Sequence, residues 1–354
     1  MNFLKLIHLI KTNKLSLKTL PATMLVMFVF ALTGCSKAPS SVNATYVERL
    51  SSTVNVNTTQ PAPLKQFPLL QPTPIAQSDL TLSIVELAGI SQCKLNVLIS
   101  EHNNQLGKTA SAAGQLKYQI NFIKSAQVCL NTLDKNSPSY TKILAAKNYK
   151  EAHLMHFFNA MLFKEPELNK TWLLTSNELS SEPAGFSDTL QALKQLVLIK
   201  QQVNAKEFSE INSDSIFNSL EQLNKYQFNQ ALIQSARMQV VLNNNATQLV
   251  KTLNFNTLCP QDKNNKKAKI ISNVFQKFYL KEIQPYQAQL TGYLEVLQPL
   301  YKELWFNESI SSPQINNLVK TDSTSNLLNL LKSSAKKHVV WWQVFYKTCE
   351  ISPI

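Results

Sequence analysis

The sequence predicts an all-α fold, an irregular multi-helix bundle that follows an N-terminal tether and a proline-rich extended arm. Glycine is scarce, with six residues in 354, and the Asn-Gly and Asp-Gly dipeptides typical of β-hairpins are absent. Apolar residues beyond residue 79 instead recur three and four positions apart, which is the period of an amphipathic helix. The chain is long enough for one large domain or two smaller ones.

The tether and the arm occupy residues 35–78. Five prolines remove backbone donors and interrupt regular structure in the arm, namely Pro61, Pro63, Pro68, Pro72 and Pro74. Leu64, Phe67 and Ile75 in the same segment are apolar enough to lie on the surface of the domain. We therefore predict an arm that is clamped to the helical domain and is not a free linker.

The helical domain is expected to span residues 79–354, with a candidate subdivision near residues 170–210. Its first helix places five side chains near one face, namely Leu87, Leu95, Leu98, His102 and Leu106. Gly107 stands where a C-terminal cap belongs, so we expect this helix to end there. A second helix carries Leu116, Ile120, Ile123 and Leu130.

A third helix is predicted to begin at Ser137 and Pro138, because Ser is a favoured N-cap and Pro fits the first helical position. Its apolar residues follow helical spacing at Leu154, Phe157, Phe158, Met161 and Leu162. Pro166 is expected to end this run.

The remaining helices are expected over six stretches of the chain. These are Ser187–Gln202, Ser213–Asn224, Phe228–Leu253, about Lys267–Leu297, a leucine-rich helix near Asn326–Leu331, and a final helix bearing Val339, Trp342 and Phe345. Pro285 should kink the helix in which it stands, because proline lacks the N–H of the helical ladder.

The first 34 residues have the order of a secretory signal peptide. Four lysines and no acidic residue stand before residue 35, at Lys5, Lys11, Lys14 and Lys18, and an apolar run follows from Met24 to Ala31. The run is shorter than the ~20 apolar residues that span a bilayer. It therefore indicates a segment that is removed on export.

The run ends in Leu32-Thr33-Gly34-Cys35, which resembles the lipobox of bacterial lipoproteins. The resemblance implies cleavage after Gly34 and attachment of diacylglycerol to the thiol of Cys35. Ser36 follows in place of the Asp that usually retains such lipoproteins in the inner membrane. We therefore expect a lipidated tether that holds the protein on the outer membrane, facing the periplasm, with the inner membrane as the weaker alternative.

Four cysteines follow the lipobox, and an even count in an oxidising compartment indicates two disulfides. Cys93 lies about as far before the turn at 107–114 as Cys129 lies after it, so antiparallel helices would bring both sulfurs to one level. This favours Cys93–Cys129 and leaves Cys259 to pair with Cys349, although four cysteines allow three pairings. None of them has the CxxC spacing typical of a zinc site.

Lysine dominates the basic residues. Loss of the four lysines of the signal peptide lowers the formal net charge from +13 to +9, and Arg49 and Arg237 are the only arginines. Lysine is a flexible point charge, so a solvated surface is the first interpretation. An envelope protein, peptidoglycan or anionic lipid is the available class of partner, and we expect no nucleic acid.

The motifs of several enzyme classes are absent. GxGxxG, GxxxxGK[ST], GxSxG and HExxH do not occur, so the sequence indicates no bound nucleotide and we expect no cofactor. Glu101, with Asn103 and Asn104 near a predicted helix end, forms the candidate functional site. Glu101 is either a general acid and base acting on peptidoglycan or lipid, or one of several residues that satisfy backbone groups at a helix terminus.

His153 and His156 form the nearest approach to a metal pattern, since residues three apart on a helix lie one turn apart. A metal site needs further ligands, and only His102 and His338 remain as histidines beyond the signal peptide. We therefore expect both side chains to flank an apolar stripe and predict no metal site.

Two segments near the C-terminal end are candidates for a partner surface. In the pair Trp341-Trp342, one ring is able to face the core while its neighbour is exposed as an anchor. A basic run precedes an aromatic segment, with residues Lys263, Lys266, Lys267, Lys269, Phe275, Phe278, Tyr279 and Tyr286. That combination is able to bind an anionic lipid or glycan, although aromatic residues at helical spacing usually form core.

Several stretches together resemble an uncharacterised family of Gram-negative lipoproteins, known only as a domain of unknown function. They are residues 46–50 (YVERL), the proline-rich arm, Cys93, residues 98–107 (LISEHNNQLG), Cys129, Cys259-Pro260, residues 273–279 (NVFQKFY) and residues 284–286 (QPY). The likeness covers most of residues 35–354 and departs at His102, where we expect Arg. It implies a lipid-anchored helical domain and supplies no activity.

Two functional hypotheses follow. The first is a non-enzymatic envelope lipoprotein that binds a protein, glycan or lipid partner. The second is an enzyme acting on peptidoglycan or lipid through Glu101, which requires a cleft with a second carboxylate or a bound water beside that residue.

Overall fold

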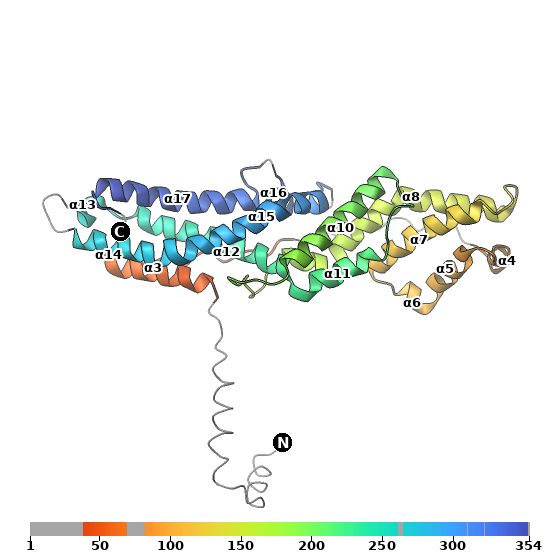
Figure 1. Ribbon diagram of the computed structural model, residues 1–354, viewed down its shortest axis with the longest axis horizontal. Helices are drawn as coiled ribbons and strands as arrows, with labels where there is room; N and C mark the ends of the chain where they lie inside the picture. Colours follow the sequence, from red (N-terminus) through yellow and green to blue (C-terminus); the bar gives the residue numbers. More distant parts are fainter. Residues whose placement is uncertain (1–37, 69–81, 261–264, 310, 322, 353–354) are drawn as a thin grey trace, which may run out of the picture. The chain divides into compact units, whose positions relative to one another are not determined.

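The computed structural model describes residues 38–68, 82–260, 265–309, 311–321 and 323–352. Pro39–Ile354 form one compact unit. All regular elements in the described residues are helices, which confirms the all-α prediction (Figure 1). No helix of the described part of the chain combines the length and the apolar character that a membrane span requires. The predicted signal peptide and Cys35 lie outside the described residues.

The helices follow one another along the chain with short connections. The first part contains α3 (Ser40–Val54), α4 (Ile84–Ala88), α5 (Lys94–Asn103), α6 (Gln105–Lys108), α7 (Ala112–Leu130), α8 (Pro138–Lys164), α9 (Pro166–Asn169) and the 3₁₀ turn η1 (Lys170–Trp172). The second part contains α10 (Phe186–Ala205), α11 (Ser215–Tyr226), α12 (Phe228–Lys251), α13 (Phe255–Leu258), α14 (Lys266–Val274), the π-helical segment η2 (Phe275–Ile283), α15 (Gln284–Trp305), α16 (Pro313–Val319) and α17 (Leu327–Thr348).

Three hydrophobic clusters stabilise the unit by removing apolar surface from water. The central cluster joins α7, α8, α10, α11, α12, α15 and α16, and its largest side chains are Phe158, Trp172, Phe228, Tyr301 and Trp305. Residues on both sides of the segment 170–210 belong to it, so this segment does not separate two cores.

The other two hydrophobic clusters share helices with the central cluster: α12 and α17 enter one of them, and α7 enters the other. The α3 cluster contains Tyr46, Leu50, Phe275, Tyr279 and Trp342, among others. The α5 cluster contains Ile90, Leu95, Ile99, Phe122 and Ile143, together with Cys93 and Cys129. Helix α7 joins the central and α5 clusters, because its first half contributes to one and its second half to the other.

The predicted polar tether is wrong from Ser40 to Val54, because this segment forms α3. Tyr46, Leu50 and Val54 recur every four residues and are buried in the α3 cluster. The many Ser, Thr and Asn residues of the segment obscured this narrow apolar stripe in the sequence.

The prediction of a clamped arm is confirmed for residues 55–68. Asn245 donates a hydrogen bond to the carbonyl oxygen of Thr59 at 2.8 Å, and the Arg237 guanidinium lies 3.7 Å from the centre of the Phe67 ring. The Gln66 side chain accepts a hydrogen bond from the backbone N–H of Leu174 at 2.8 Å. The rest of the arm, with Pro72, Pro74 and Ile75, lies outside the described residues.

The single helix predicted to run from Asp79 to Gly107 is wrong, since the chain forms α4, α5 and α6 there. Ser83 and Glu86 form a capping box that begins α4. The side chain of Asn104 accepts a hydrogen bond from the N–H of Gly107 at 2.8 Å and begins α6. Gly107 therefore lies inside a short helix and is not the predicted C-cap.

The third predicted helix is confirmed as α8, with Ser137 as its N-cap, Pro138 in its first turn and Pro166 just beyond its end. The helix expected over 267–297 is also present, but it contains η2 between α14 and α15. Pro285 is the second residue of α15 and lies two positions after the end of η2. The missing N–H of proline thus coincides with the change from π to α geometry.

The two helices predicted near Asn326–Leu331 and at Val339–Phe345 are one helix, α17, for which Asn326 provides the N-cap. The polar residues between the two apolar patterns suggested a break. Ser334 and His338 are buried there in contact with polar partners on α12 and α3. The short helices α13 and α16 were not predicted.

Candidate functional site

Both favoured disulfides are confirmed. Cys93, the N-cap of α5, is bonded to Cys129 in the last turn of α7, with the two Cα atoms 5.4 Å apart. Cys259, which follows α13, is bonded to Cys349 at the end of α17 over the same Cα distance. The first bond fixes α5 against α7, and the second fixes the end of the chain against the segment that follows α12.

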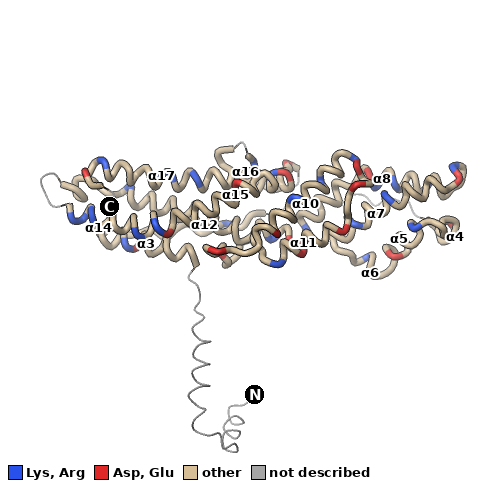
Figure 2. Tube along the Cα trace, viewed as in Figure 1, with Lys and Arg blue, Asp and Glu red and all other residues tan. Residues whose placement is uncertain are grey.

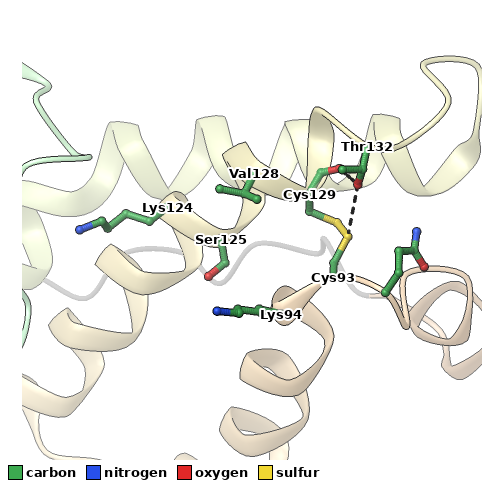
Figure 3. A pocket seen from close by; sticks show the side chains of 8 residues that line it. Cys93, Lys94, Lys124, Ser125, Val128, Cys129 and Thr132 are labelled. Carbon is green, nitrogen blue, oxygen red and sulfur yellow. Dashed lines mark hydrogen bonds between the residues drawn. A yellow bond between two sulfur atoms is a disulfide. The ribbon is translucent and has the colours of Figure 1, made fainter.

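An open cleft of about 420 Å³ lies beside the first disulfide. Its lining is Gln92, Cys93 and Lys94 at the start of α5, with Lys124, Ser125, Val128, Cys129 and Thr132 on and after α7. The α7 residues lie on one helical face, since they are one, three or four positions apart. Figure 3 shows that the side chains of Lys94 and Lys124 extend away from the Cys93–Cys129 bond.

The cleft combines positive charge with exposed apolar surface. Val128 is 68% exposed, and Val97, one turn beyond Lys94 on α5, is 58% exposed. The Lys124 ammonium donates a hydrogen bond to the carbonyl oxygen of Ile211 at 2.9 Å, which holds this side chain beside the cleft. A ligand that fits here has an apolar part and an anionic or hydrogen-bond-accepting group.

A second cluster of polar and aromatic groups packs on the same helices. The His102 ring stacks on Tyr118 at 3.6 Å between centroids, and the Lys150 ammonium lies 4.9 Å from Tyr118 and 4.6 Å from Phe122. Burial lowers the pKa of Lys150 to about 8 and raises the pKa of Tyr118 to about 12. Burial, and then the charge of Lys150, lower the pKa of His102. These groups cover the core, and no ion pair among the described residues joins a carboxylate to His102.

His338 is the centre of a buried hydrogen-bonded chain that the sequence analysis missed. Its Nε2 lies 2.8 Å from the Tyr46 hydroxyl and accepts a hydrogen bond from the Trp342 indole at 3.1 Å, and its Nδ1 lies 3.2 Å from the Thr247 hydroxyl. Thr247 itself donates to the carbonyl oxygen of Asn243 at 2.7 Å. Its oxygen is therefore the acceptor for Nδ1–H, and His338 is neutral with Nε2 as an acceptor.

The surroundings of His338 are consistent with this neutral state. The side chain is fully buried, and burial lowers its pKa to about 3. A neighbouring set of buried amides links the same helices, since Asn43 and Gln239 exchange two hydrogen bonds and Gln287 donates to Gln239 and Asn243 at 2.9 and 2.8 Å. Because these partners are satisfied internally, this region has a structural role.

Comparison with known proteins places the chain in a family. The family model described as a protein of unknown function, DUF3080, matches residues 43–353. The chain belongs to the DUF3080 family. Neither the curated proteins nor the solved structures contained a match. The DUF3080 match begins inside α3, in agreement with the packing of this helix into the folded unit.

In this DUF3080 chain, Glu101 and Asn103 are exposed on α5, and Glu101 does not line the cleft beside Cys93. Asn104 caps α6 through its side-chain oxygen, as a residue at a helix terminus was expected to do. The role of Glu101 as a general acid and base stays a prediction, and the cleft that this role requires does not include Glu101 in its lining.

His153 and His156 lie on α8, as predicted. The His153 Nδ1 is 2.7 Å from the carbonyl oxygen of Tyr149, and the His156 ring packs edge-on against Phe157. Burial, and then the charge of Lys164, lower the pKa of His156. Over the residues that the structure describes, no three His, Cys, Asp or Glu side chains come together in a group suited to a metal ion.

Trp342 is the ring of the Trp341-Trp342 pair that faces the core, since it is buried and stacks on Phe275 at 4.3 Å. A partner surface there is therefore limited to Trp341 and stays a prediction. Trp341 is half-buried and stacks on Phe345. Helical geometry turns adjacent residues by about 100°, which leaves both rings in contact with the α3 cluster.

The aromatic residues that follow the basic run belong to the core. Phe275, Tyr279 and Tyr286 are buried, so the interpretation of this segment as core is confirmed for them. Phe278 is half-buried, and Lys263 lies outside the described residues.

Proposed function

We propose that this protein is a Gram-negative envelope lipoprotein, acylated at Cys35 and held on the outer membrane, whose helical domain binds a partner in the periplasm. The order of basic start, apolar run and lipobox supports export and acylation. Two disulfides support an oxidising compartment, because such bonds are rare in proteins of the cytosol.

The observation that carries the binding role is the open cleft between α5 and α7. It places Lys94, Lys124 and the exposed Val128 around one depression, and the Cys93–Cys129 bond fixes its two walls. An envelope protein with an exposed apolar side chain next to a carboxylate fits this lining. A fixed surface of this kind loses little conformational freedom on binding, which favours affinity.

Export and acylation are tested by mass spectrometry of the N-terminal peptide of the protein purified from envelopes. We expect a diacylglycerol-modified peptide that begins at Cys35, and we expect Cys35→Ala to abolish it. The denatured protein should have no reactive thiol, because its other four cysteines are paired. Two or more reactive thiols would contradict the export argument.

Binding is tested by crosslinking in cells, purification of the tagged lipoprotein and identification of the proteins that remain attached. Val128→Asp should remove the crosslinked partner. Val344→Asp is the matched control, because Val344 is 47% exposed on α17 and far along the chain from the cleft. If both variants retain the same partner, the cleft is not its binding site.

A further inference from the structure

A stripe of lysines runs along one face of the helix formed by α14 and η2. Its exposed residues are Lys266, Lys269, Ile270, Asn273, Lys277 and Lys281. Residues 266–282 contain five lysines and a single acid, Glu282. Figure 2 shows the positive positions along α14. We call these six residues the lysine stripe.

The stripe is a fixed feature of the fold, because the opposite face of the same helix is buried. Ala268, Ile271, Phe275, Tyr279 and Ile283 belong to the α3 cluster and hold the stripe outward. The stripe borders an open, shallow depression of about 550 Å³ that is lined by Asn273, Gln276, Lys277, Lys281 and Glu282.

The charges of the stripe are not neutralised by ion pairs within the described residues. The four ion pairs found there join other lysines to Glu86, Glu151, Asp214 and Glu295. Ile270 stands among the stripe lysines with 41% of its surface exposed. Flexible ammonium groups with apolar stems around an exposed isoleucine suit a fluid, negatively charged surface better than a rigid bidentate ligand.

The lysine stripe lies next to α3, the helix through which the tether joins the folded unit. Helix α3 packs against α14 and η2, and the Tyr46 and Tyr279 rings of these elements are 5.7 Å apart. The backbone N–H of Ser40 donates to Glu178 at 2.8 Å, and the next residue, Leu179, accepts a hydrogen bond from Tyr286 at 2.7 Å. The first turn of α3 is thus connected to the helix turn that follows Lys281.

The length of the tether limits how far the folded unit is able to move from its anchor. Five peptide units join Cys35 to Ser40, and a fully extended chain spans at most about 3.6 Å per residue, or about 18 Å in all. An acyl group on Cys35 therefore keeps the start of α3 within that distance of the bilayer surface. The neighbouring stripe then meets lipid headgroups at a high effective concentration.

We propose that the lysine stripe binds the anionic phospholipid headgroups of the membrane that holds the anchor, so that α14 and η2 lie against the bilayer. The inference rests on the proposed acylation of Cys35 for its biological setting. The contact itself depends on charge, and it orients the helical unit while leaving the cleft at α5 and α7 available to a partner.

The test uses residues 36–354, exported by a cleavable signal without a lipobox so that both disulfides form and no acyl chain is present. This part contains the whole compact unit from Pro39 onward with its three hydrophobic clusters. Its binding is measured by co-sedimentation with vesicles of phosphatidylglycerol and phosphatidylethanolamine and with vesicles of phosphatidylcholine. We expect binding to the anionic vesicles alone, and its loss in high salt.

The variant Lys269→Gln/Lys277→Gln/Lys281→Gln should bind the anionic vesicles roughly 150-fold more weakly, since each lysine near such a surface contributes ~1 kcal/mol and 1.4 kcal/mol is a factor of ten. The matched control removes the exposed Lys108, Lys135 and Lys194 by the same change and should bind as the parent does. Arginine at the three stripe positions should retain binding.

Equal binding to both kinds of vesicle, equal loss in the control, or no binding by the parent would overturn the inference. These outcomes are separate from the mass of the N-terminal peptide. If the peptide is not acylated and the unit still binds anionic vesicles through the stripe, the anchor fails and the stripe remains. If the peptide is acylated and no vesicle binding occurs, the anchor stands and the lysine stripe is not a membrane-binding surface.

Discussion

The α3 cluster and the α5 cluster differ in which side chains they bury: polar groups are buried around the first, and large apolar groups are exposed around the second. Around the α3 cluster, His338, Tyr46 and Trp342 are buried and hydrogen-bonded to one another. Around the α5 cluster, the core is small, and five large apolar side chains are exposed by more than half, namely Ile84, Val85, Val97, Leu106 and Val128.

The difference indicates a division of roles within one compact unit. Buried polar groups that find all their partners fix the register of α3, α12 and α17. The exposed Val128 in the lining of the open cleft is the apolar group on which the proposed partner surface rests. Each region has one disulfide, so the bonds stabilise the scaffold at one place and the walls of the cleft at the other.

Removal of the disulfides should have the largest effect and should separate the two regions. The Cys259–Cys349 bond closes 90 residues and the Cys93–Cys129 bond closes 36, which corresponds to about 5 and about 4 kcal/mol of chain entropy. We expect paired Cys→Ala variants to lose stability in urea in that order. Limited proteolysis of the Cys93→Ala/Cys129→Ala variant should cut α4–α6 first, and cleavage that begins in α17 would contradict the comparison.

His338→Ala is expected to lower the free energy of unfolding by about 3 kcal/mol, because it leaves a cavity and removes the acceptor of the buried Tyr46 hydroxyl, while the Trp342 indole keeps only its hydrogen bond to Tyr46. His102→Ala is the control from the other region, where the ring is partly exposed and stacks on Tyr118. We expect a loss of about 1 kcal/mol or less there. Equal losses in urea unfolding would remove the distinction.

Stability should fall in acid because of His338. Burial lowers the pKa of His338 from 6.5 to about 3. Between these two pH values the imidazole is protonated in the unfolded chain and neutral in the folded chain. The contribution is therefore complete above pH 6.5 and decreases by up to about 1.4 kcal/mol per pH unit as the pH falls toward 3. Urea midpoints for the parent and for His338→Gln should converge over this range, and parallel curves would exclude His338 as the cause.

Glu165→Gln tests the start of α7, the helix that joins the central and α5 clusters. The buried Glu165 carboxylate accepts a hydrogen bond from the backbone N–H of Ala113 at 2.5 Å, at the positive start of α7. We expect a loss of about 1 kcal/mol, measured by thermal unfolding. The half-buried Glu167→Gln on α9 would serve as the control and should change stability by less than half as much.

Val128→Asp should have the smallest effect on stability, below about 0.5 kcal/mol, because its side chain is 68% exposed. The same variant is expected to lose the crosslinked partner. A large loss of stability would show that Val128 supports the α5 cluster. The loss of the partner would then no longer indicate that Val128 contacts it.

The comparison also separates local from long-range information in the sequence. The Ser137-Pro138 start of α8 and its end before Pro166 follow from capping and proline geometry, which act between near neighbours. The favoured disulfides join residues 36 and 90 positions apart, and they followed from the cysteine count and the placement of Cys93 and Cys129 about one turn of the chain. The break between α5 and α6 was missed because Asn104 caps a new helix inside an apolar pattern that continues past it.

The sequence by itself determined the helical class and the order of most helices, because the period of apolar residues is a local property. It also favoured the cysteine pairing, through the number and positions of the cysteines. Only the tertiary structure decided that the polar segment at Ser40–Val54 is core and that His338 meets Tyr46, from 292 residues earlier in the chain. It also decided where the cleft opens, since its walls come from two helices that a disulfide joins. A buried polar group and an exposed one have the same letter in the sequence, and only the packing around each distinguishes them.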